Sequence, residues 1–155
     1  MLGGCMAQLA PAYDQTIDTG LASTNTSMQT LFVQIGTGSD AATYASQGRE
    51  AAYVQVIGAL KALEVQAQAR PLPPADLLTT VNDLLAQQGK PQLTADPNFS
   101  DYPSVRAMHD AEVTLIAMQT EDARAGLHGM AVNAFENQAT TYLSQAITYE
   151  NFLNR

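Results

Sequence analysis

The stretch that decides the fold is residues 17–35, IDTGLASTNTSMQTLFVQI. Its apolar and small residues recur in alternating steps of four and three, at Ile17, Leu21, Thr24, Met28, Leu31 and Ile35. Because an α-helix turns once in about 3.6 residues, these positions share one face. The pattern therefore predicts an amphipathic helix from about Tyr13 to Ile35, which the glycines of residues 36–38 end.

The same period continues through the first half of the chain. Ser39 and Asp40 offer N-cap oxygens to a second helix, expected from about Ala41 to Ala69. Its apolar positions are Tyr53, Val56, Leu60, Leu63 and Ala67, with Ile57 widening the face. The proline-rich residues 70–74 stop that helix, and Pro74 suits the first turn of a third, shorter one. The dense apolar face of this third helix comprises Leu77, Leu78, Val81, Leu84 and Leu85.

Helical spacing returns after an irregular stretch at residues 89–103. A fourth helix is predicted from Ser104, on the spacing of Met108, Ala111, Leu115 and Met118. A last helix is predicted from the apolar positions between Val132 and Leu153. Between them, Gly126 and Gly129 favour a break, with Gly126 as a left-handed C-cap. The alternative is one continuous helix, since the apolar steps keep their phase through residues 108–132.

No segment alternates with the period of two that a strand requires. The expected fold class is all-α: an up-and-down bundle of four long helices with a shorter additional helix, four to five helices in all. Residues 13–155 are expected to form a single helical-bundle domain behind a flexible tether at residues 1–12.

Composition narrows the classes of function. The net charge of −8, the pI near 4.4 and the presence of only two lysines argue against a nucleic-acid partner. One cysteine cannot form an internal disulfide, so the fold must depend on its core. No uncharged apolar run approaches the roughly 18 residues of a membrane-spanning helix.

The single cysteine lies in Leu2-Gly3-Gly4-Cys5. An aliphatic residue and two small residues before a cysteine are the end of a bacterial lipoprotein signal, where the cysteine sulfur takes up diacylglycerol. Cys5 is therefore the predicted lipidation site, and residues 1–4 are interpreted as a lipobox remnant. A diacylated cysteine supplies the two chains that firm membrane anchoring needs.

Three further stretches carry a family resemblance. Tyr13-Asp14 opens the first helix, Asp122-x-Arg124-x-Gly126-Leu127 lies at the glycine break, and residues 149–155 read YENFLNR. In order and spacing these resemble an uncharacterised lipoprotein family of Gram-negative bacteria, small helical-bundle proteins of the cell envelope. The resemblance implies an acylated cysteine and residence in the periplasm, on the surface of the outer or inner membrane. It carries over no active site.

The sequence matches the motifs of metal-binding and catalytic helical bundles only in part. Di-iron bundles need paired Glu-x-x-His motifs, whereas this chain has His109 and Glu112 once, in the reversed order. These two residues share a helical face and could hold an adventitious ion, but a polar pair on the rim of a helix is favoured. Methionines at core spacing favour packing over a noncovalent haem. We therefore expect no catalytic residue, no metal and no cofactor.

Tyrosines and charges leave two alternatives open. Tyr53, Tyr142 and Tyr149 are expected to bury their rings, and the alternative is a binding groove lined by them. Arg49 and Glu50 near the start of the second helix could pair across the bundle with Asp122 and Arg124 near the glycine break. Ordinary solvated charges, worth less than roughly 1 kcal/mol per pair, are favoured.

The function expected from the sequence is a non-enzymatic envelope lipoprotein, a helical bundle that acts as a binding or structural module. Its partners would be the membrane, through the lipid on Cys5, and an unknown protein or small molecule. One alternative is a small-ligand- or metal-binding four-helix bundle in the periplasm. The other is an oligomeric helical scaffold, which would require an exposed apolar stripe.

Overall fold

The computed structural model describes residues 13–36, 40–70, 77–92 and 103–154. These residues are all-helical, and no strand occurs among them. The helices are α1 (Gln15–Gly36), α2 (Ala41–Ser46), α3 (Arg49–Gln68), α4 (Leu77–Gln87), α5 (Pro103–Ala125) and α6 (Met130–Leu153).

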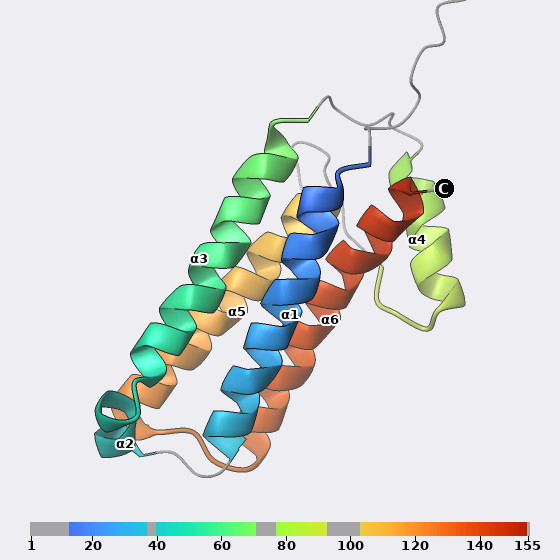
Figure 1. The fold of residues 1–155 in the computed structure, drawn as a ribbon. Helices are drawn as coiled ribbons and strands as arrows, with labels where there is room; N and C mark the ends of the chain where they lie inside the picture. Colours follow the sequence, from blue (N-terminus) through green and yellow to red (C-terminus); the bar gives the residue numbers. More distant parts are fainter. Residues whose placement is uncertain (1–12, 37–39, 71–76, 93–102, 155) are drawn as a thin grey trace, which may run out of the picture.

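The four long helices pack side by side, each against two of the others (Figure 1). α1 contacts α3 and α6, and α5 contacts the same two helices from the other side. The short α2 lies against α3 and α5 at one end of the molecule, while α4 packs on the outer side of α6. The helical body is therefore closed around one shared interior.

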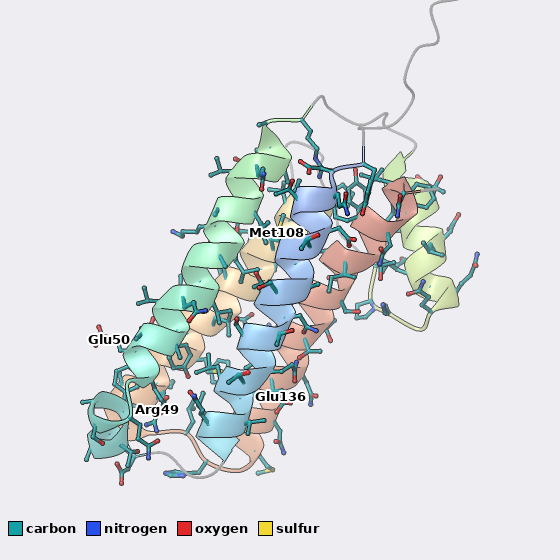
Figure 2. The ribbon with its side chains drawn as sticks, viewed as in Figure 1. Arg49, Glu50, Met108 and Glu136 are labelled. Atoms are coloured by element: carbon teal, nitrogen blue, oxygen red, sulfur yellow. The ribbon has the colours of Figure 1, made fainter. Side chains whose placement is uncertain are left out.

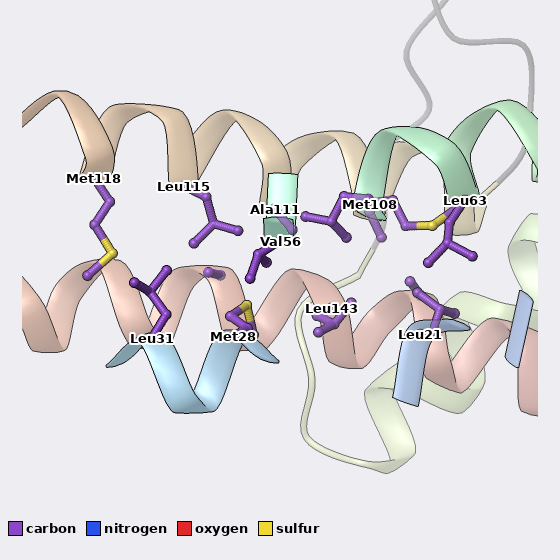
Figure 3. Close-up of a cluster of buried hydrophobic side chains, with 14 of the residues drawn as sticks. Leu21, Met28, Leu31, Val56, Leu63, Met108, Ala111, Leu115, Met118 and Leu143 are labelled. Atoms are coloured by element: carbon purple, nitrogen blue, oxygen red, sulfur yellow. The ribbon is translucent and has the colours of Figure 1, made fainter. Parts of the chain in front are cut away.

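The predicted apolar faces of α1 and α3 line that interior. All six residues of the α1 seam are buried, and so are all five of the α3 seam. In the close-up of Figure 3, side chains of three helices point into the shared interior: Leu21, Met28 and Leu31 of α1, Leu115 and Met118 of α5, and Leu143 of α6. Each fully buried leucine or methionine contributes about 1.5–3 kcal/mol of transfer free energy, so the seams stabilise the packing of all four helices.

The helix expected over residues 41–69 is divided into α2 and α3, so the described part of the chain holds six helices rather than four to five. The division falls at Gly48, whose φ of +67° is left-handed and suits glycine. Asp40 caps α2 as expected: its side chain accepts from the Thr43 N–H at 2.7 Å, and Thr43 Oγ1 accepts from the Asp40 N–H. Apolar periodicity could not show the division, because α2 has no buried residue.

The break between the last two long helices is confirmed. Gly126 has a φ of +75°, and its N–H donates to the carbonyl oxygen of Asp122 at 3.0 Å. This left-handed glycine ends α5. Leu127 is buried beyond it, and α6 begins at Met130.

Among the described residues, none of the helices is both long enough and apolar enough to cross a bilayer.

Candidate functional site

One polar cluster joins α3 and α5. Glu64 comes from the last turns of α3, while His109 and Glu112 lie one turn apart on α5. One ligand atom from each of the three side chains lies within 4.8 Å of the others. Nδ1 of His109 is 3.9 Å from Oε2 of Glu64. The fold therefore adds a second carboxylate, from a different helix, to the His109–Glu112 pair.

The cluster is shielded from solvent on the carboxylate side. The side chain of Glu112 is 5% exposed and that of Glu64 is 12% exposed, whereas that of His109 is 35% exposed. Oε1 of Glu64 is buried and has no hydrogen-bond partner. A buried carboxylate oxygen without a partner is energetically costly, because it has lost its water and gained no donor.

Lys61 supplies the nearest formal positive charge. Lys61 lies on α3, one turn before Glu64. Its Nζ is 3.0 Å from Oε1 of Glu112. The Lys61 side chain is 63% exposed, so this ion pair is open to water on the lysine side and is worth little net stability.

The neighbouring Glu112 carboxylate affects the ionisation of Glu64. Three causes together raise the pKa of Glu64 from its ordinary value of 4.5 to about 7: burial first, then the charge of Glu112 and a hydrogen bond with Glu112. Lys61 acts in the opposite direction. A pair of close carboxylates can share a proton, or it can be neutralised by a cation.

A second polar cluster corrects the expectation that Arg49 and Asp122 are solvated. Both side chains are 0% exposed, and Nε of Arg49 donates to Oδ2 of Asp122 at 3.0 Å. Arg49 also donates to the carbonyl oxygen of Asp40 and to Oγ1 of Thr43. The pair therefore ties the end of α5 to the α2–α3 junction, where Figure 2 shows Arg49.

Tyr53 belongs to this second cluster. Its hydroxyl lies 3.4 Å from Oδ2 of Asp122, and burial together with the Asp122 charge raises the pKa of the hydroxyl. The ring of Tyr44 faces the Arg49 guanidinium at 5.8 Å, a cation–π distance. These contacts hold the α2–α3 junction against the end of α5.

A third ion pair closes the opposite end of the helices. Nη1 and Nη2 of Arg70 donate to the two carboxylate oxygens of Glu150 at 2.8 and 2.7 Å. The Glu150 side chain is 0% exposed. This two-point geometry between a guanidinium and a carboxylate is the strongest form of the contact, and it joins the residues after α3 to α6.

The three tyrosines proposed as a groove lie in different surroundings. Tyr53 and Tyr149 are 0% exposed and belong to the core, which agrees with the expected burial of their rings. Tyr142 is half-buried and lines a shallow surface depression with Pro91 and Gln138. The structure therefore does not bring the three rings together on an open surface.

A cleft of about 550 Å³ lies between α4 and the long helices. Its volume falls in the range of small-ligand sites. It is lined by Asn25, Leu84, Gln88, Lys90, Thr140, Ser144, Ile147, Thr148 and Asn151. Among the described lining residues Lys90 is the one that is charged, and its Nζ donates to Oγ1 of Thr148 at 2.9 Å.

Cys5, the predicted lipidation site, lies outside the described residues. Glu64 is the residue of the first cluster that the sequence analysis missed. It directly follows Leu63 on the apolar seam of α3. A glutamate at the edge of an apolar seam was the sequence signal that could have indicated a partly buried carboxylate. No spacing rule links it to His109, 45 positions later.

No protein-family model, curated protein or solved structure matches this chain.

Proposed function

We propose that this protein is a non-enzymatic lipoprotein of the Gram-negative cell envelope. In this proposal the four long helices form an up-and-down bundle, and the bundle acts as a binding or structural module at the membrane surface. Leu2-Gly3-Gly4-Cys5 is the observation that carries the location. A diacylglycerol on Cys5 would hold the protein on the periplasmic surface of the inner or outer membrane.

The arrangement of the helices supports this proposal. α1 begins at Gln15, ten residues after Cys5. Ten residues can span at most about 35 Å, so the lipid would keep the body close to the bilayer. The end of the helical body at which α1 begins also contains the end of α3 and the Arg70–Glu150 pair. A rigid end near the anchor suits a module that presents a surface at a membrane.

The buried charges support a structural role for the helical body. Arg49 and Asp122 are bonded to each other, and Arg70 to Glu150. Such contacts hold helices in register, since breaking one partner away leaves a buried charge uncompensated.

Lipidation is tested by expressing the gene from its own locus and labelling the cells with an alkyne fatty acid. We expect the label to appear on the protein, the protein to fractionate with membranes, and Cys5→Ser to lose both properties. An unlabelled product in the cytosol would overturn the proposal.

A second candidate, a small-ligand- or metal-binding bundle, is favoured by two described features. The cleft beside α4 offers neutral hydrogen-bonding groups and one lysine. The Glu64–His109–Glu112 cluster offers metal ligands. The second feature carries a more specific inference.

A further inference from the structure

We propose that Glu64, His109 and Glu112 form a binding site for a divalent first-row transition-metal ion such as Zn²⁺, at the interface of α3 and α5. The inference is independent of the lipid anchor, because the three residues lie in the helical body. It adds the carboxylate of Glu64 to the His109–Glu112 pair, and only the packing of α3 against α5 brings this carboxylate near.

The first argument is the chemistry of the donors. Imidazole nitrogen suits Zn²⁺ and its first-row neighbours, and carboxylate oxygen completes a mixed N/O set. Mg²⁺ and Ca²⁺ prefer all-oxygen sites. Three protein ligands leave at least one position for water, and the exposed side of His109 gives an ion access from solvent.

The second argument is geometry. Ligand atoms at about 2.0–2.2 Å from a tetrahedral zinc ion lie roughly 3.4 Å apart. The three donors already lie within 4.8 Å of one another, so closing the site requires shifts of about 1 Å that torsions of glutamate side chains can supply. His109 and Glu112 are three residues apart on one helix, which is the spacing at which side chains meet.

The third argument is that the site holds two close carboxylates and a buried carboxylate oxygen that lacks a hydrogen-bond partner. The Glu64 and Glu112 carboxylates are close and shielded, and Oε1 of Glu64 is buried without a hydrogen-bond partner. A divalent cation would satisfy that oxygen and remove the repulsion between the two carboxylates.

Lys61 would compete with the ion. Its ammonium now neutralises part of the charge on Glu112, at 3.0 Å. Because the lysine side chain is largely exposed, it can move into water when a metal binds. Removing this charge should strengthen metal binding, whereas a purely structural ion-pair cluster would gain no affinity.

The test is a calorimetric titration of the purified full chain with Zn²⁺ at pH 7.5. Cys5→Ser is the background for every variant, because a thiolate also binds zinc. We expect one site per chain, weakened at least about tenfold by Glu64→Gln, Glu112→Gln or His109→Asn. Lys61→Gln should strengthen binding several-fold, and Mg²⁺ at millimolar concentration should not compete.

His128→Asn is the matched control. His128 is the only other histidine, and it is exposed beyond the end of α5. Its loss should leave the affinity unchanged. The proposal is overturned if Zn²⁺ fails to bind at millimolar concentration, if only His128→Asn abolishes binding, or if Glu64→Gln and Glu112→Gln both bind normally.

A measurement on the unsubstituted cluster guards against variants that unfold. With two histidines in the chain, each imidazole has its own NMR signals. Substoichiometric Zn²⁺ should shift the signals of His109 and leave those of His128 in place. The reverse pattern, or equal small shifts of both, contradicts the site.

Discussion

At the scale of the residue, Asp122 shows how burial changes the meaning of a charge. On a solvated helix face, an ion pair contributes less than roughly 1 kcal/mol. In this structure the carboxylate has no exposed surface and accepts from both Arg49 and Tyr53. Its removal would leave the Arg49 guanidinium buried without its charge partner.

We therefore expect Asp122→Ala to lower the free energy of unfolding by about 3–5 kcal/mol. Urea denaturation followed by circular dichroism measures this quantity. Asp110→Ala is the matched control, since its ion pair with Arg106 is about one-quarter exposed and should cost less than about 1 kcal/mol. Equal losses for the two variants would show that the buried Arg49–Asp122 pair stabilises the protein no more than a partly exposed ion pair does.

At the scale of the element, two helix-interior glycines have different surroundings. Gly20 of α1 faces α3 so closely that an added Cβ would lie 2.5 Å from Cδ2 of Leu63. Gly58 of α3 has no atom within 4 Å of that position. Gly20 therefore permits the close packing of α1 on α3, whereas Gly58 only weakens its own helix.

Gly58→Ala should raise the free energy of unfolding by about 0.5–1 kcal/mol, because alanine lowers the entropy cost of forming a helix. Gly20→Ala gains the same propensity but must displace the end of the Leu63 side chain, so we expect it to raise stability less than Gly58→Ala does. Thermal unfolding of the two variants beside the parent chain measures the difference. Equal stabilisation by both would mean that the Leu63 side chain moves aside at no cost.

At the scale of the whole molecule, the Glu64 carboxyl makes stability depend on pH. Its pKa is about 7 in the folded, metal-free protein and about 4.5 when the chain is unfolded. The folded state therefore binds the Glu64 proton more tightly than the unfolded state does. The stability that this adds to the folded state is present in full below pH 4.5. That added stability is lost as the pH rises through 7.

Glu112, Lys61 and His109 surround this carboxyl, and the site is partly open to water. We therefore expect a modest loss of stability, about 1 kcal/mol between pH 5 and pH 8, discounted for solvent screening. Urea unfolding in the presence of EDTA measures the slope, and Glu64→Gln should flatten it. A slope that Glu64→Gln leaves unchanged would assign the titration to another group.

Local residue patterns were sufficient to predict the inward faces of α1 and α3 and the end of α5. Every residue of the α1 and α3 seams is buried as its spacing predicts, and Gly126 ends α5 in a left-handed conformation. This succeeded because amphipathic spacing and glycine caps act within one or two helical turns. The division of α2 from α3 lay beyond that reasoning, since α2 has no buried residue to mark it.

The polar contacts depend on which helices become neighbours. Glu64 and His109 are 45 positions apart, and Arg49 and Asp122 are 73 apart. Chain spacing does not specify such pairs; packing α3 against α5 does. Composition and periodicity thus account for an all-helical chain with an apolar interior. The three-dimensional packing decided which charges are buried, and it brought two carboxylates and an imidazole together, because side chains distant in sequence meet only when their helices pack.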